Sequence, residues 1–230
     1  MAEKPIIHFE PWHGEFGWEV MTWAPQCRLQ AADAGGGAVV ISFAGMAPLY
    51  DDFASFQAHD KTGRSLKYPK RYRGRGLHRR YGDAGRAIVQ CDVLIHARGI
   101  RRKSTINYQS WPPLVERLKA RPVSIGWVGS EWDTALYYGL DLRARPLAEL
   151  MDLIAAAKVV VGVSSGLVHL AAACGTDLVV WGDRRTYFGE TLERRYKATW
   201  NPHHVGVEWI DADDWQPAPQ QIHHAIERIL

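Results

Sequence analysis

The feature that most constrains the fold is VVVGVSSGLVHLAAACG, residues 159–175. Its run of β-branched residues favours a buried strand, and the small residues after it favour a turn. The alanine-rich stretch that follows has the composition of a helix. A strand, a short turn and a helix in this order form the repeating unit of a parallel, doubly wound sheet. We therefore predict an α/β fold.

The same alternation extends along the rest of the chain. Strands are predicted at 5–11, 38–45, 92–99, 123–129, 177–182 and 205–210. Helices are predicted at 18–33, 46–58, 111–120, 146–157 and near the C-terminus. We divide the chain into a small α/β domain at 1–91 and a Rossmann-like domain at 92–230.

The turn between the strand and the helix has the chemistry of an anion site. Ligands of open α/β sheets bind beyond the carboxyl ends of the strands, where Ser164, Ser165 and Gly166 are expected to lie. A helix N-terminus there offers unpaired N–H groups and a partial positive charge, both of which favour phosphate. His169, one helical turn further on, can donate to a phosphate oxygen. A serine-capped helix with a half-buried histidine is the alternative explanation.

Composition excludes several other classes. The chain has 230 residues, of which 47% are hydrophobic, enough for a globular core. It has no apolar run long enough to span a membrane, and its N-terminus lacks the pattern of a secretory signal. The three cysteines are odd in number, far apart and in no Cys-x-x-Cys pair, which argues against a disulfide framework or a thiolate metal site, so we expect a cytoplasmic protein. Its oligomeric state is not predicted.

The segment VVVGVSSGLVHLAAACGTDLVVWGD resembles the hallmark of the heptosyltransferase-like glycosyltransferases, glycosyltransferase family 9, which have the GT-B fold. The residues that match are Ser164, Ser165, Gly166, His169, Gly175 and Gly182. The resemblance implies two Rossmann-like domains facing a cleft, with the N-terminal one reduced here. It also implies that the turn holds the pyrophosphate of a nucleotide-diphosphate sugar. The family more often has Asp at position 164 and Pro at position 176.

The segment DVLIHARGIRRKSTINYQSWPPLVERL is similar to the opening of the family's donor domain. Arg98 and Lys103 in its basic loop could neutralise the departing diphosphate, and Arg101 and Arg102 could do so equally well. A solvated basic loop is the alternative. Trp127, at the end of the next predicted strand, is a candidate for the nucleobase pocket.

A third segment, GEFGWEVMTWAPQCR, resembles the family's N-terminal motif, a Gly-Asp pair followed by a proline. Aligning Pro25 with that proline puts Glu19 in the place of the family's catalytic carboxylate. Inverting glycosyl transfer needs one base to deprotonate the acceptor hydroxyl, and this mechanism needs no metal or other cofactor. Glu15 is the rival candidate for that base, and one of the two acids could simply complement the helix dipole.

The acceptor is predicted from charge. Between Lys61 and Arg86 lie ten basic residues and one acid, interleaved with tyrosines. Such a segment neutralises phosphates and offers rings for stacking. We predict a polyanionic acceptor, with DNA carrying a hydroxymethylated pyrimidine, as in some bacteriophages, as the first hypothesis. A phosphorylated glycolipid core and a merely solubilising loop are the alternatives. The expected contacts are Arg71, Arg73, Arg79 and Arg80.

Two other functional classes fit parts of the sequence. A nucleotide-sugar 2-epimerase shares the fold but usually has more active-site acids, and a non-catalytic nucleic-acid binder leaves the Ser-Ser-Gly turn unexplained. Asp211 and Asp213 match a metal-chelating Asp-x-Asp, but we interpret them as an acidic cluster before the last helix. The adjacent pairs His203–His204 and His223–His224 are poor chelates, since neighbouring side chains diverge.

Overall fold

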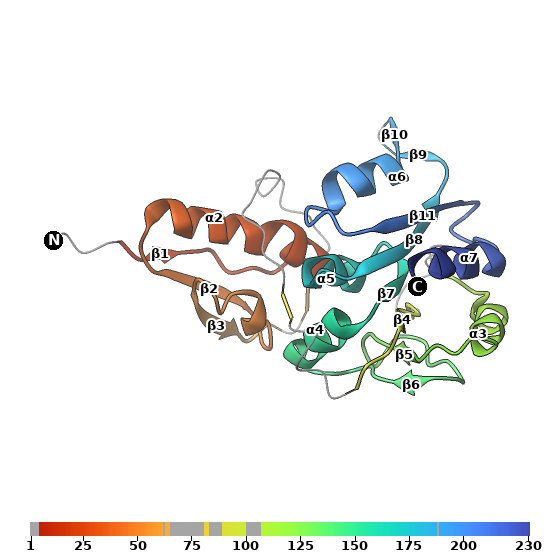
Figure 1. The fold of residues 1–230 in the computed structure, drawn as a ribbon. Helices are drawn as coiled ribbons and strands as arrows, with labels where there is room; N and C mark the ends of the chain where they lie inside the picture. The colour runs from red at the N-terminus through yellow and green to blue at the C-terminus, as the bar shows by residue number, and fades with distance from the viewer. Residues whose placement is uncertain (1–4, 62, 65–80, 83–88, 100–106, 188) are drawn as a thin grey trace. The chain divides into compact units, whose positions relative to one another are not determined.

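The computed structural model describes residues 5–61, 63–64, 81–82, 89–99, 107–187 and 189–230 (Figure 1). Internal contacts divide the chain into two compact units, Met1–Arg79 and Arg80–Leu230. Each contains its own parallel sheet with helices. The prediction of an α/β fold is confirmed.

The N-terminal unit is built on a three-stranded parallel sheet. Its order is β1 (Ile7–His8), β2 (Ala38–Phe43) and β3 (Ser55–His59). Between β1 and β2 the chain forms α1 (Phe16–Trp18), the π-helix η1 (Glu19–Trp23) and α2 (Ala24–Ala34). A π turn widens a helix by one residue and is frequent at functional sites.

The prediction of a helix at 46–58 is wrong. The only helical piece within that range is the 3₁₀ turn η2 (Ala47–Leu49), and β3 follows it. Pairing with β2 gives the backbone of β3 its hydrogen bonds, so long-range pairing decides a segment whose local pattern is weak.

The C-terminal unit has a six-stranded sheet in which every strand pair is parallel. The order is β11 (Val207–Ala212), β8 (Asp177–Asp183), β7 (Val159–Val163), β4 (Val93–Ile95), β5 (Ile125–Trp127) and β6 (Leu140–Asp141). Its central strands are buried on both sides, as expected for a sheet between two helix layers.

Helices cover both faces of this sheet (Figure 1). The pair α3 (Trp111–Lys119) and α7 (Pro219–Ile229) packs on one face, and the pair α4 (Leu147–Ala156) and α5 (Gly166–Cys174) on the other. The remaining elements are β9 (Thr186–Tyr187), β10 (Glu190–Thr191), α6 (Leu192–Arg195) and the π-helix η4 (Tyr196–Trp200). No helix among the described residues has the length and apolar character of a membrane span.

The topology brings the ends of β4 and β7 together. These strands are direct neighbours, with Ile95 opposite Val161, so the residues that follow each strand share one edge of the sheet. At that edge β7 leads into α5 through Ser164 and Ser165. The predicted anion site therefore lies at the carboxyl edge of a parallel sheet.

Candidate functional site

The N-terminus of α5 lacks a side-chain cap. Ser165 occupies the N-cap position with extended backbone, but its hydroxyl makes no cap hydrogen bond. Its Oγ instead lies 2.9 Å from Nδ1 of His96. The alternative explanation of a serine-capped helix therefore does not hold at Ser165, because its hydroxyl contacts His96 instead. The first N–H groups of α5 therefore do not donate to the Ser165 side chain, which leaves them suited to donate to an anion.

His169 is buried in an aromatic setting one turn further along α5. Its side chain is 6% exposed, and its ring stacks on Tyr196 with centroids 5.6 Å apart. Nε2 lies 3.4 Å from the hydroxyl of Ser164, so the ring is oriented toward the turn. Burial lowers the pKa of His169 to about 4, and a backbone hydrogen bond to Trp200 opposes that shift only in part. His169 is therefore a neutral hydrogen-bonding group near pH 7.

A second histidine, His96, and the carboxylate of Asp133 lie at the same edge of the sheet as the start of α5. His96 follows β4, and its Nε2 lies 3.4 Å from an oxygen of Asp133. That carboxylate also accepts the backbone N–H groups of Gly99 and Ser130, each at 2.7 Å. Burial acts to raise the pKa of Asp133, but His96 and the two N–H groups outweigh it and lower the pKa. The carboxylate is therefore held ionised against the imidazole.

His96 and Asp133 are not indicated by the sequence patterns described above. His96 stands inside the predicted strand at 92–99, where it looked like one polar residue in an apolar run. A usable signal was present, since a polar residue at the end of a buried strand points to the functional edge of a parallel sheet. Asp133 offered no such signal, because its place depends on how the loop after β5 folds back.

The other predicted donor residues differ in their surroundings. Arg98 is half-buried, and its backbone N–H donates to the carbonyl of His96 at 3.0 Å. Trp127 is 1% exposed in the core, so its ring has no surface for a nucleobase, whereas Trp132 in the following loop is 59% exposed. A Cβ at Gly182 would lie 2.7 Å from the ring of Trp209, so packing alone accounts for that glycine. Lys103 lies outside the described residues, as do Arg101 and Arg102.

Glu19, the carboxylate chosen by alignment, is closed off within the N-terminal unit. It is fully buried in η1 and accepts hydrogen bonds on both of its oxygens. Ser42 and Tyr50 donate to Oε1, the tyrosine at 2.7 Å, and Arg64 donates to Oε2 at 2.7 Å. A base has to reach the proton that it abstracts, so this geometry suits an anchor better than a base.

Glu15 has a different environment. It is the half-exposed residue before α1, and its side chain makes no cap hydrogen bond. In the same unit, side-chain nitrogen atoms lie close together where the segment after β1 meets the end of β3. Nδ1 of His13 lies 3.2 Å from Nε2 of His59, and Nε2 of His13 lies 3.2 Å from the Lys61 ammonium. Burial, Lys61 and His59 together lower the pKa of His13.

The predicted acceptor contacts all lie outside the described residues. They are Arg71, Arg73, Arg79 and Arg80. Arg64, from the start of the same basic segment, is described, and it is the partner of Glu19.

The acidic pair at the end of β11 is satisfied without a metal. Asp213 forms an ion pair with Arg184 at 2.9 Å, and Asp211 accepts the indole N–H of Trp209 at 2.9 Å. Both precede α7 by several residues, so they belong to the strand end and not to the helix start.

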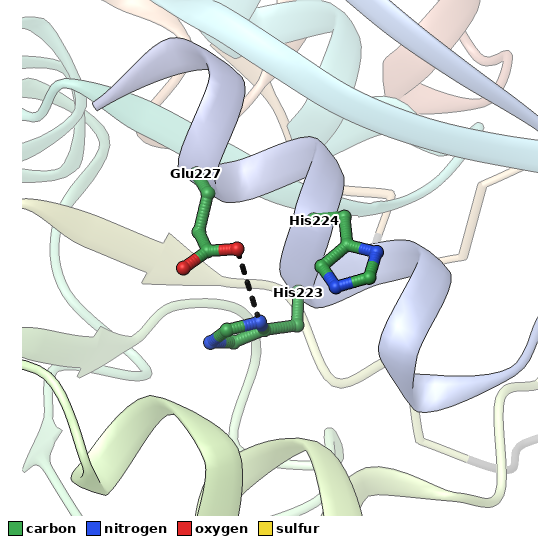
Figure 2. Close-up of side chains that lie close together, drawn as sticks. All are labelled: His223, His224 and Glu227. Atoms are coloured by element: carbon green, nitrogen blue, oxygen red, sulfur yellow. Dashed lines mark ion pairs between the residues drawn. The ribbon is translucent and has the colours of Figure 1, made fainter.

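One His/Glu cluster among the described residues has metal-like geometry. Figure 2 shows His223 and Glu227 pointing toward each other from α7, with His224 beside them; Nδ1 of His223 lies 3.5 Å from the carboxylate. The ligand atoms of all three lie within 4.8 Å of one another, so the expectation that this histidine pair diverges is wrong. Arg121 forms an ion pair with Glu227, which places a positive charge at the cluster and disfavours a cation there.

Comparison with known proteins finds one matching family model and several structures of similar fold. A family model described as glycosyltransferase family 9 (heptosyltransferase) matches residues 144–208, which include α4, β7, α5 and β8. No curated protein matches the chain in sequence.

Solved structures with the same fold include three glycosyltransferases. The ADP-heptose lipopolysaccharide heptosyltransferase II of E. coli is 13% identical, with a TM-score of 0.65 over 97% of this chain and 98% of that one. TibC of enterotoxigenic E. coli, described as an iron-containing dodecameric glycosyltransferase, is 14% identical, with a TM-score of 0.60 over 94% of this chain and 63% of that one. A family 9 glycosyltransferase from Veillonella parvula is 9% identical, with a TM-score of 0.50 over 87% of this chain and 76% of that one.

The chain therefore has the fold of these glycosyltransferases, which is of the GT-B type. Within the chain, residues 144–208 carry the match to glycosyltransferase family 9 (heptosyltransferase). The chain spans less than two thirds of the TibC chain.

Proposed function

We propose that the chain transfers a sugar from a nucleotide-diphosphate sugar, bound at the N-terminus of α5, to an acceptor hydroxyl. The observation that carries this proposal is the uncapped start of α5, with Ser165 held by His96 and with His169 one turn away. N–H groups at a helix start bind diphosphate oxygens directly. TibC has been solved with ADP-D-β-D-heptose, which supports an ADP-linked heptose as the first donor to test.

The chemistry that we propose is a direct, inverting displacement without a metal. The acceptor oxygen attacks the anomeric carbon as the bond to the diphosphate breaks, and a carboxylate takes the acceptor proton. The α5 N–H groups and His169 stabilise the charge that develops on the diphosphate. Exposure supports Glu15 as the base and a positioning role for buried Glu19, which reverses the preference that the alignment gave. A cytoplasmic location stays part of the proposal, supported by three free, buried cysteines.

For the acceptor we propose a phosphorylated saccharide. The ten basic residues between Lys61 and Arg86 favour a polyanion, and the E. coli neighbour named above is a lipopolysaccharide heptosyltransferase. The hypothesis of hydroxymethylated DNA stays a prediction, and it rests on the same charge and on the interleaved tyrosines.

The first experiment is ligand-dependent thermal unfolding with ADP. Saturation at about 100 times Kd stabilises a protein by about 2.7 kcal/mol, so a clear rise in Tm is expected. His169→Ala should reduce the rise, whereas His224→Ala, which truncates an exposed histidine of α7, should leave it unchanged. Absence of any rise in the wild type contradicts the proposed donor site.

A transfer assay then separates the reactions. ADP-heptose with a phosphorylated saccharide should release ADP and give a larger saccharide. Product on hydroxymethylated DNA alone supports the DNA hypothesis in its place. Conversion of the nucleotide sugar without any acceptor indicates an epimerase, and DNA binding without ADP binding indicates a nucleic-acid-binding protein.

A further inference from the structure

Three groups from separate parts of the C-terminal unit form one row of polar contacts at the start of α5. The row runs from the Ser165 hydroxyl through the His96 ring to the Asp133 carboxylate, with separations of 2.9 and 3.4 Å. His96 is 7% exposed and Asp133 is also largely buried, so water screens the pair poorly.

The protonation state of His96 determines whether the Ser165 hydroxyl donates its hydrogen bond to His96 or to a ligand. The ionised Asp133 fixes a proton on Nε2 of His96. When the ring is neutral, Nδ1 is an acceptor and takes the hydroxyl proton of Ser165. When the ring is protonated, Nδ1 donates to the Ser165 oxygen, and the hydroxyl proton is free to point toward a ligand.

An anion bound at the start of α5 favours the protonated state of His96 in two ways. It is attracted by the imidazolium charge, and it accepts the hydrogen bond that Ser165 then offers. We infer that diphosphate binding at α5 is coupled to the uptake of one proton by His96, with Asp133 as the counter-charge and Ser165 as the group that delivers the hydrogen bond. The inference rests on the proposed donor site, and it makes His96 a positioning residue for the diphosphate.

Among the described residues, the side chains of Asp133 and Ser165 make polar contacts with the His96 ring. Asp133 is the charged group that faces the ring from the loop after β5, and Ser165 faces it from α5. Arg98 lies two residues beyond His96 in the segment after β4, and its backbone N–H donates to the His96 carbonyl. His169, also on α5, has a pKa of about 4 and stays neutral between pH 6 and pH 8.

The test is the pH dependence of ADP affinity in the wild type and in His96→Asn. Asparagine can still hydrogen-bond Ser165 but cannot take up a proton. Because ADP ionises identically in both measurements, the ratio of the two affinities isolates the contribution of His96. The wild-type advantage should grow by about tenfold or more between about pH 8 and about pH 6, since one linked proton gives up to tenfold per pH unit.

Two further variants complete the design. Asp133→Asn keeps an acceptor for Gly99 but removes the charge, so its affinity at pH 6 should fall toward that of His96→Asn. His224→Asn, on α7, should retain the wild-type pH profile. Melting temperatures of all variants show which of them are folded.

The outcomes separate the two claims. ADP binding with an affinity ratio that is flat in pH overturns the proton coupling alone. No ADP binding at any pH overturns the proposed donor site and the coupling with it. A wild-type advantage that grows as pH falls, and that Asp133→Asn reduces, supports both.

Discussion

Replacing Glu19 by glutamine tests whether this buried carboxylate holds the N-terminal unit together. The amide keeps one oxygen for the donors Ser42 and Tyr50. Its NH₂ group then faces the guanidinium of Arg64, which is itself a donor. The change therefore replaces an ion pair by two donors in contact and leaves a positive charge without its buried partner.

The magnitude follows from the burial of the two partners. Removing one member of a fully buried ion pair costs about 3–5 kcal/mol. Glu19 is fully buried, but the Arg64 side chain is 25% exposed, so water recovers part of the loss. We expect a decrease in the free energy of unfolding of about 2–4 kcal/mol. For a chain of this size, 3 kcal/mol lowers Tm by about 6–12 °C.

The assay pairs thermal unfolding with turnover measured well below the lowest Tm. Glu15→Gln is the matched control, because it makes the same chemical change at a half-exposed position with no cap hydrogen bond. Its Tm should stay within about 1 °C of the wild type. If Glu15 is the base, the same variant should lower turnover by about 100-fold while ADP affinity holds.

The opposite pattern refutes the reasoning. A Glu19→Gln protein with wild-type Tm means that the contacts with Ser42, Tyr50 and Arg64 do not stabilise the unit. If that protein is also inactive while Glu15→Gln turns over normally, Glu19 is the base, as the alignment suggested.

Three further predictions concern the donor site, the acceptor and pH. His169→Ala should weaken ADP binding by about 0.5–1.5 kcal/mol in calorimetry, the contribution of a neutral hydrogen bond, because burial keeps the ring uncharged; an unchanged Kd in a folded variant argues against the contact. The stability of the unliganded chain should fall as pH drops from about 6.5 toward 4, because a folded-state pKa of about 4 lies below the unfolded value, and His169→Gln should flatten this part of the stability curve; equal curves would refute the burial argument. Binding of a polyanionic acceptor should weaken with salt, with a log–log slope near −0.9 per phosphate neutralised on duplex DNA, and a fourfold alanine variant should flatten that slope without changing ADP affinity; an unchanged slope would exclude those side chains. The four positions are Arg71, Arg73, Arg79 and Arg80.

Local sequence determined the parallel α/β class and the place of the anion site. The valine run at 159–163 and the alanine-rich stretch after Gly166 carry strong, agreeing local preferences, and β7 and α5 form where they predict. Parallel topology then requires the turn between them to lie at the ligand-binding edge of the sheet. The strand at 55–59 escaped prediction because its local pattern is weak and its hydrogen bonds come from β2.

Only the tertiary structure decided which side chains complete the site. A serine cap on α5 was the alternative explanation of the turn, but pairing of β4 with β7 brings His96 to the Ser165 hydroxyl. Asp133 reaches the same imidazole from a loop whose path no local pattern encodes. Glu19 and Glu15 look alike in sequence, yet the packing of Ser42, Tyr50 and Arg64 closes one carboxylate and leaves the other half-exposed. Residues far apart in the chain set burial and hydrogen bonding, and these two quantities determine whether an acid serves as an anchor or as a base.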